Sequence, residues 1–154
     1  HIFHTSNKAV WDFVNSFVPF NRLTLDNNYF DDEYQGIPIG GYNKLIDGLL
    51  DGIECRTNTD FFFDRLTLEA LAKNIVYTGK LDEFYNYQYG KLEYHTQDGI
   101  ELSSPKSDNH NRAISAHYRR IAGREPNVIF GGRLAEYKYY NMDELIEKAL
   151  LMWE

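Results

Sequence analysis

The spacing of apolar residues along the chain predicts helices that alternate with short strands. Where apolar side chains recur every three or four positions, one face of a helix is expected to be buried. This spacing predicts helices in residues 7–18, 37–50, 66–73, 112–122 and 142–153. The first would be capped by Ser6 or Thr5, and the second follows a glycine turn and is stopped by Gly52. Short apolar runs bounded by turn residues predict strands in residues 53–57, 75–77 and 128–130.

The order of these elements predicts an α/β fold. Helices that alternate with strands are typical of a layered domain with a partly parallel sheet, because parallel strands need a crossover between them. We therefore expect one compact layered domain over residues 1–154, with a partly parallel sheet flanked by helices and a helical lead segment in 1–22. Residues 95–111 are dense in turn formers, which predicts a loop or linker there.

Charge and composition exclude several classes of protein. The 154 residues carry a net charge of −7, which argues against nucleic acid as a partner, since its binders need clustered Lys and Arg. No apolar run approaches the roughly 20 residues that cross a bilayer, so we expect no membrane partner. The single Cys55 can form neither an internal disulfide nor a cysteine–metal cluster, which predicts a cytoplasmic location and no metal. Because the chain does not begin with Met, we expect a piece of something longer.

Aromatic residues make up 16% of the chain, and half of them are tyrosines. The tyrosines gather in Tyr85-x-Tyr87-x-Tyr89 and in Tyr137-x-Tyr139-Tyr140, and alternate spacing places side chains on one face of a strand. Such a surface could stack on a sugar or a flat heterocycle, because each ring is apolar with a polar tip. The alternative is ordinary packing on a sheet, and the spacing leaves both interpretations open.

Two glycine turns follow predicted strands: Thr78-Gly79 after 75–77, and Gly131-Gly132-Arg133 after 128–130. In open α/β sheets, ligands bind beyond the carboxyl ends of the strands, where glycines let a nucleotide approach the backbone. Arg133 would then bind a phosphate, since its guanidinium matches phosphate oxygens with two parallel hydrogen bonds. A glycine after a strand is also an ordinary turn, and the chain has no G-x-G-x-x-G motif to hold a dinucleotide.

One long motif and several shorter ones run through most of the chain. The long motif is Phe130-Gly131-Gly132-Arg133-Leu134-Ala135-Glu136-Tyr137-Lys138-Tyr139-Tyr140. The shorter ones lie in residues 1–5, 10–15, 26–30, 34–42 and 77–79. Together they closely resemble prokaryotic UDP-galactopyranose mutase. The resemblance implies a flavoenzyme of cell wall biosynthesis that interconverts UDP-galactopyranose and UDP-galactofuranose, in which FAD carries the chemistry and protein groups hold the substrate.

The resemblance also implies roles for individual residues. It assigns catalytic roles to Arg22, Tyr139 and Asn141. It assigns FAD contacts to His1, Thr78, Gly79, Gly132 and Arg133. It places Tyr29, Tyr34 and Tyr139 at the site for UDP-galactose.

The chain departs from the family pattern in ways that bear on activity. The family's amino-terminal βαβ unit, with its G-x-G-x-x-G, would precede His1, and gaps follow Arg22 and His95. The family's Tyr-Tyr-Pro is Ser103-Ser104-Pro105 here, and Asn141 stands for an aspartate, so a ring, a hydroxyl donor and a charged acceptor are lost. We therefore expect an internally shortened mutase that is inactive by itself.

Two alternatives to an inactive derivative remain open. One is a residual mutase that still binds FAD through the surviving strand ends. The other is a nucleotide-sugar or carbohydrate binding module that uses the tyrosine surface. In any of these, an apolar patch left bare by the gaps would predict self-association.

Overall fold

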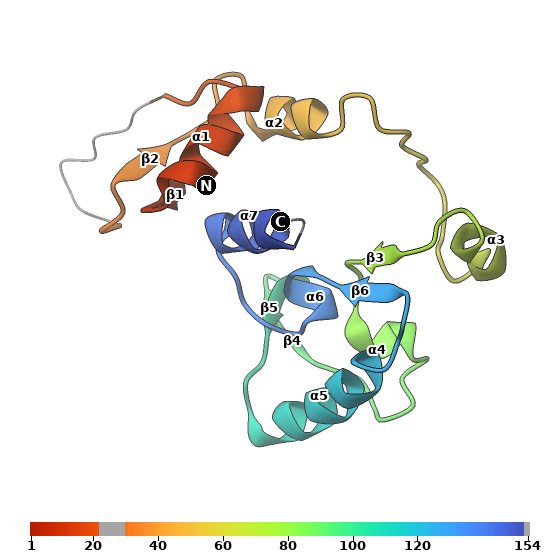
Figure 1. Ribbon diagram of the computed structural model, residues 1–154. Helices are drawn as coiled ribbons and strands as arrows, with labels where there is room; N and C mark the ends of the chain where they lie inside the picture. The colour runs from red at the N-terminus through yellow and green to blue at the C-terminus, as the bar shows by residue number, and fades with distance from the viewer. Residues whose placement is uncertain (22–29, 153–154) are drawn as a thin grey trace. The chain divides into compact units, whose positions relative to one another are not determined.

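The computed structural model describes residues 1–21 and 30–152, and Figure 1 gives the order of its elements. Contacts divide the chain into two compact units. Unit 1 comprises His1–Thr57 and Asn141–Glu154, and unit 2 comprises Asn58–Tyr140. Each unit has a core of its own. The single domain expected over residues 1–154 stays a prediction.

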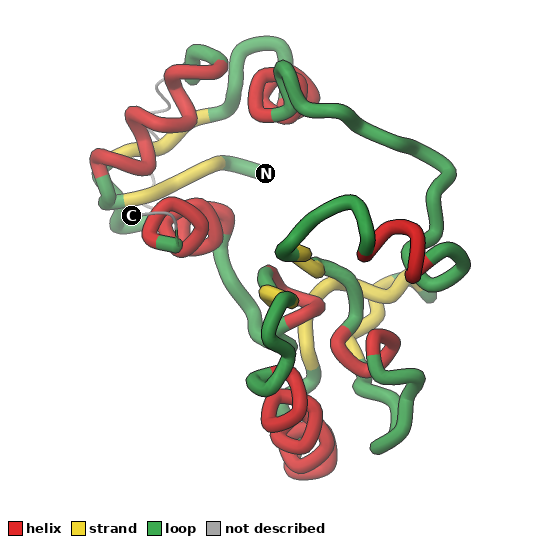
Figure 2. The backbone as a smooth tube through the Cα atoms, turned by 45° about the vertical axis from the view of Figure 1, so that its right-hand side comes forward, coloured by secondary structure: helices red, strands yellow, loops and turns green. Residues whose placement is uncertain are grey.

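Unit 1 contains a two-stranded antiparallel sheet and three helices. The strands are β1 (Phe3–Thr5) and β2 (Tyr34–Gly36), with Phe3 opposite Gly36. The helices, red in Figure 2, are α1 (Lys8–Phe17), α2 (Tyr42–Leu49) and α7 (Met142–Leu151). Their apolar faces share one core with the sheet, whose buried members are Phe3, Val10, Trp11, Val14, Val18, Phe20 and Leu45.

The predicted helix in residues 7–18 is confirmed as α1, but Asn7 caps it in place of Ser6 or Thr5. The Asn7 side-chain oxygen accepts a hydrogen bond from the N–H of Ala9 at 2.9 Å. An amide side chain at this position satisfies donors that the first turn of a helix leaves free. The lead segment 1–22 is not wholly helical, because Phe3–Thr5 forms β1.

The other two helices of unit 1 are confirmed as well. α2 follows Gly41, whose φ of +92° is a conformation that glycine adopts without strain. α7 follows its N-cap residue Asn141, and its residues Ile146 and Leu150 pack against the core of unit 1. Trp153, at the end of the predicted helix, lies outside the described residues.

Unit 2 contains a parallel strand pair, an antiparallel hairpin and short helices. β3 (Ile75–Tyr77) pairs in parallel with β6 (Val128–Phe130), whereas β4 (Tyr94–Gln97) and β5 (Ile100–Pro105) are antiparallel. The helices are α3 (Arg65–Glu69), α4 (Leu81–Phe84), α5 (Asn109–Ala122) and α6 (Gly132–Ala135). The predicted α/β class with a partly parallel sheet flanked by helices is thus confirmed.

Tyrosines contribute much of the core of unit 2. Tyr118 and Leu81 are fully covered, and Tyr94 and Tyr137 are nearly so. The Tyr118 hydroxyl donates to the carbonyl of Gly90 at 2.8 Å, so its polar tip has a partner. A second cluster contains Tyr77, Phe84 and Ala135. These rings pack in the core, which favours ordinary packing as the interpretation of the tyrosine content.

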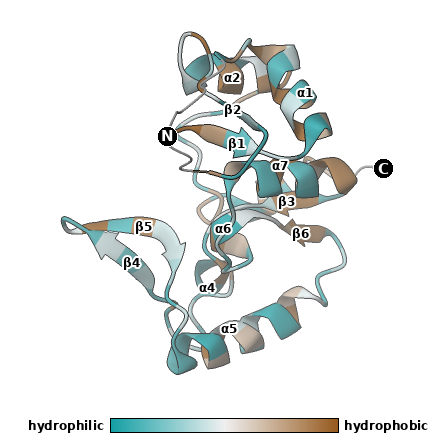
Figure 3. Cartoon of the chain, turned by 90° about the vertical axis from the view of Figure 1, so that its left-hand side faces the viewer, coloured by the Kyte–Doolittle hydropathy of each residue, from teal (hydrophilic) through white to brown (hydrophobic). Residues whose placement is uncertain are grey.

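The predicted loop in residues 95–111 is wrong, because β4, β5 and the first turn of α5 occupy most of it. Asp98 and Gly99 form the turn of the hairpin, with φ of +51° and +78°, and Gln97 pairs with Ile100 across it. Positive φ at both positions matches the twist of antiparallel strands, and Asp-Gly is a preferred sequence for this turn. Figure 3 shows the two strands side by side.

Other strand predictions fail where the chain turns. Residues 53–57 do not form a strand, and Ile53 is 60% exposed. Tyr85, Tyr87 and Tyr89 do not share a strand face, because Tyr87 has a φ of +57° within a series of turns after α4. The predicted helix in 66–73 is shorter than expected, since α3 ends at Glu69. Within the described ranges, no helix combines the length and apolar character that crossing a membrane requires.

Candidate functional site

Parallel pairing brings the two glycine turns to the same edge of the sheet in unit 2. Tyr77 at the end of β3 lies opposite Phe130 at the end of β6, and the N–H of Gly131 donates to the Tyr77 carbonyl at 3.1 Å. Thr78, Gly79 and residues 131–133 therefore follow neighbouring strand ends, as the sequence predicts. We call these residues the glycine edge.

The two key glycines of this edge are required for different reasons. A Cβ on Gly79 would lie 2.5 Å from the Tyr77 hydroxyl, which itself donates to the carbonyl of Lys80 at 3.1 Å. Gly79 is therefore needed by the packing of its own chain. Gly132 has a φ of +91° and open space where a Cβ would stand, so backbone conformation alone favours glycine there.

Arg133 and Tyr139 come together beside this edge. The Arg133 guanidinium lies 4.2 Å from the centroid of the Tyr139 ring, and its Nε donates to the Tyr140 carbonyl at 2.6 Å. These contacts fix the guanidinium while its terminal nitrogens have no partner among the described residues. Tyr139 is 55% exposed. A cation and an exposed ring in contact can bind a phosphate next to a flat or sugar group.

Glu136 contacts the glycine edge, and sequence reasoning missed it. Its carboxylate accepts the N–H of Gly132 at 3.0 Å and the hydroxyl of Tyr140 at 2.7 Å. The backbone donor that the resemblance would direct at a cofactor is therefore already bonded within the chain. The available signal was an acidic residue four positions after the glycine, close enough to reach back to the free N–H of the preceding turn.

The remaining predicted site residues belong to unit 1 or lie outside the residues that the structure describes. His1 is exposed, and its carbonyl accepts the Tyr42 hydroxyl at 3.1 Å. Tyr34 stacks on Trp11, with ring centroids 5.7 Å apart. Asn141 caps α7, and its N–H donates to the Glu144 carboxylate at 2.6 Å. Arg22 and Tyr29 fall in residues 22–29, outside the described ranges.

The tyrosines of the long motif divide between core and surface. Tyr137 is 5% exposed, and its hydroxyl lies within hydrogen-bond distance of the carbonyls of Glu93 and Lys106. Burial raises the pKa of Tyr137 to about 12, because the charged phenolate would lose its hydration. Tyr139 is exposed, so the alternating pair does not form one stacking surface. The predicted tyrosine platform is reduced to Tyr139 at this motif.

A second polar cluster in unit 1 was also missed by sequence reasoning. Nδ1 of His4 lies 2.6 Å from the Asp32 carboxylate, which also accepts the Ser6 hydroxyl at 2.7 Å. The His4 ring stacks on Phe30 at 3.8 Å between centroids. Burial opposes ionisation of Asp32, but the hydrogen bonds from Ser6 and His4 outweigh it and lower the pKa of this carboxyl. His4 therefore serves local packing and bonding.

Comparison with known proteins gives the family. A sequence model of the family described as UDP-galactopyranose mutase matches residues 2–104. The chain belongs to the UDP-galactopyranose mutase family. A probable UDP-galactopyranose mutase of Klebsiella pneumoniae is 25% identical over 186 residues, which cover 84% of this chain and 48% of that protein.

Two further relatives support the same family. A dTDP-fucopyranose mutase of Escherichia coli is 24% identical over 190 residues, covering 84% of this chain and 50% of that protein. A UDP-galactopyranose mutase of Mycoplasma pneumoniae is 24% identical over 198 residues, covering 83% of this chain and 50% of that protein. The chain thus spans about half the length of the curated relatives it matches. Since these alignments are longer than the 154-residue chain, they contain gaps within it, as expected of a shortened mutase.

The described residues do not fit FAD as a family member would be expected to hold it. The donor of Gly132 is bonded to Glu136, and the same carboxylate would repel a phosphate placed there. Gly79 is packed against Tyr77 and presents no open cradle. Among the described residues predicted to contact FAD, only Arg133, with free terminal nitrogens, matches the chemistry of a diphosphate. Within the described residues, the cofactor half of the predicted site thus offers Arg133 but neither glycine.

Proposed function

We propose that this chain is an internally shortened derivative of a UDP-galactopyranose mutase that does not catalyse the interconversion by itself. The observation that carries the proposal is the bond between the Gly132 N–H and Glu136, at the point where family resemblance places the cofactor. The gaps in the alignments support it independently. Without a complete cofactor site, the positioning and electrostatic stabilisation that drive catalysis are lost.

The ligand class follows from the relatives and from Arg133. The relatives are named as mutases of UDP-galactopyranose and dTDP-fucopyranose, both sugars linked to a nucleoside diphosphate. We assign the diphosphate of such a ligand, UDP-galactose by resemblance, to the free nitrogens of Arg133, with Tyr139 beside the sugar. The residues of this chain would hold and orient the phosphate.

Two alternatives have an observation in their favour. A residual FAD-binding mutase is favoured by the survival of the paired strand ends at the glycine edge. A nucleotide-sugar or carbohydrate binding module without flavin is favoured by the exposed Tyr139 ring against Arg133. A cytoplasmic location, the absence of nucleic acid as a partner and self-association remain parts of the proposal. The single cysteine, the net charge of −7 and the exposed apolar residues support them in turn.

Flavin retention separates these functions. The purified chain is incubated with excess FAD, desalted, and examined by visible absorbance. We expect a colourless protein, because the Gly132 donor is taken and no glycine-rich cradle is present. A yellow protein would favour the residual mutase, and turnover of UDP-galactofuranose after dithionite reduction would overturn the proposal of inactivity. Calorimetric binding of UDP-galactose without flavin would favour the binding module.

Arg133 provides a residue-level test of the phosphate assignment. Arg133→Ala should weaken binding of UDP-galactose, measured by equilibrium titration, by about tenfold, because a charge-assisted hydrogen bond is lost. Arg112→Ala is the matched control, since Arg112 bonds Asn109 on exposed α5 at 2.6 Å, away from the glycine edge. Equal affinities for the wild type and Arg133→Ala would remove Arg133 from the site.

A further inference from the structure

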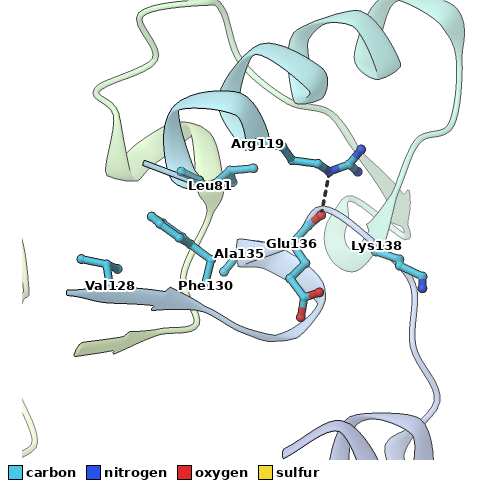
Figure 4. A pocket seen from close by; sticks show the side chains of 9 residues that line it. Leu81, Arg119, Val128, Phe130, Ala135, Glu136 and Lys138 are labelled. Carbon is cyan, nitrogen blue, oxygen red and sulfur yellow. Dashed lines mark hydrogen bonds between the residues drawn. The ribbon is translucent and has the colours of Figure 1, made fainter. Parts of the chain in front are cut away.

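A cavity of about 460 Å³ lies in unit 2, lined by none of the residues to which the resemblance gives a role. It forms where α4, the end of α5, β6 and α6 come together, and Figure 4 shows side chains from each of them. This volume falls in the range of small-molecule sites. All of its lining residues belong to one compact unit.

The floor of this cavity is apolar. Phe130 and Val128 of β6 are partly exposed and form its surface, and Leu81 and Ala135 of the lining are buried. A polar group placed against them would lose its hydration without gaining a hydrogen bond. The part of a ligand that fills the floor is therefore apolar.

Two cations stand at the rim. Nε of Arg119 donates to the Glu136 carbonyl at 3.3 Å, and one terminal nitrogen donates to the Tyr137 carbonyl at 3.1 Å. These bonds fix the guanidinium, whose other terminal nitrogen has no partner within the described ranges. The Lys138 ammonium lies 4.6 Å from the centroid of the Tyr140 ring and makes no ion pair with any described carboxylate.

The cavity lining has one acidic residue, Glu136, against these two cations. The Glu136 carboxylate is held by the Gly132 N–H and the Tyr140 hydroxyl, and Figure 4 shows its side chain running away from Arg119. The rim thus has a positive balance in a chain whose net charge is −7. An anionic group would gain most there, because both cations lie beside an apolar, weakly hydrated surface.

We propose that this cavity binds a small apolar carboxylate, with its body on Val128 and Phe130 and its carboxylate at Lys138 and Arg119. Charge complementarity at the rim selects the anion, and the apolar floor excludes free phosphate and other fully polar anions. This binding goes beyond the proposed function, because it uses neither the glycine edge nor a nucleotide. Its failure would leave the assignment of Arg133 untouched.

Nuclear magnetic resonance of the ¹⁵N-labelled full chain tests the proposal with 2-naphthoate as the probe and 2-naphthamide as its neutral match. We expect naphthoate to shift the amide signals of residues around the cavity, such as Ala122 and Lys138, and to bind more tightly than naphthamide. Equal affinities for the two compounds, shifts confined to other surfaces, or no binding at millimolar naphthoate would each overturn the proposal.

Two variants locate the charge and the floor. Lys138→Gln should weaken naphthoate binding by about fivefold and leave naphthamide unchanged. Lys91→Gln is the matched control, because Lys91 also lies over a tyrosine, 5.2 Å from the Tyr87 centroid, and does not line the cavity. Ala122→Leu should reduce binding of both compounds by filling the floor. If Ala122→Leu does not fold, the two lysine variants provide the test. Equal naphthoate affinities of Lys138→Gln and Lys91→Gln would overturn the proposal.

Discussion

Tyr137 and Tyr139 stand two positions apart and have opposite surroundings. Tyr137 is 5% exposed and bonds backbone carbonyls, whereas Tyr139 is 55% exposed and lies against Arg133. Tyr137 has a φ of +47°, which turns the chain between them. The same side chain thus serves stability at one position and is available to a ligand at the other.

This difference predicts a difference in stability between two matched variants. Tyr137→Phe removes the donor that serves the carbonyls of Glu93 and Lys106, and should lower the free energy of unfolding by about 1–3 kcal/mol. Tyr139→Phe should change it by less than about 0.5 kcal/mol, since an exposed hydroxyl is replaced at the surface. Urea unfolding followed by circular dichroism measures both. Equal losses would contradict the role given to the Tyr137 hydroxyl.

Pairing between elements explains why the glycine edge exists at all. β3 and β6 are separated by more than fifty positions in the sequence, and only their parallel register places Thr78 next to Gly131. The helix between them, α5, depends on its own cap. Asp108 accepts the N–H of Asn111 at 2.8 Å and also its side-chain amide at 2.8 Å.

The α5 cap predicts a pH dependence at acid pH. Hydrogen bonds from the Asn111 backbone and side chain lower the pKa of Asp108 below its ordinary 3.8, because they favour the charged form. The cap's charge-dependent contribution is therefore full above pH 3.8 and is lost as pH falls through the lower value of the folded state.

Two substitutions at this position separate the cap from its charge. Asp108→Ala should lower the free energy of unfolding at neutral pH, and this free energy should fall less on acidification than in the wild type. Urea unfolding at neutral and at acid pH measures both effects. Asp108→Asn should keep most of the stability at neutral pH, since Asn is also a good cap, and lose the acid dependence. Identical acid profiles in wild type and Asp108→Asn would contradict this account.

At the scale of the whole molecule, exposed apolar residues in unit 2 predict self-association. Phe63 and Leu66 are 94% and 85% exposed, and Leu71 and Val76 are more than half exposed. Such exposure is costly in water when the residues form a patch. Sedimentation velocity should give an average mass that rises with protein concentration. Leu66→Glu should reduce this rise.

Ile100→Glu is the control for this experiment. Ile100 is 68% exposed at the tip of the β4–β5 hairpin and undergoes the same change of charge and size. We expect it to leave the association unchanged. A monomer at every concentration would contradict self-association, and an equal effect of both variants would contradict its location around Leu66.

The expected single domain predicts that the two units unfold together. Trp11 is buried in the core of unit 1, so in a Trp153→Phe background Trp fluorescence follows that unit, whereas Tyr137 stabilises unit 2. If the domain is single, Tyr137→Phe should shift the Trp fluorescence transition in urea as far as the circular dichroism transition. A fluorescence transition that stays in place would show two independent units.

The sequence by itself determined the helices α1, α2, α5 and α7, the strands β3 and β6, and the family. Apolar spacing, caps and long motifs are local signals, and each is complete within a few residues. The prediction of a loop failed at the β4–β5 hairpin. Asp98 and Gly99 are common in loops, but in this order they also favour a tight turn between two strands.

Only the tertiary structure decided what those elements present to a ligand. Glu136 bonds the Gly132 amide, Arg133 stacks on Tyr139, and Tyr137 is buried through contacts with residues up to 44 positions away. A backbone donor looks free in any sequence until the fold supplies an acceptor. Burial and partnership depend on which distant segments meet in space, so no local pattern could have given them.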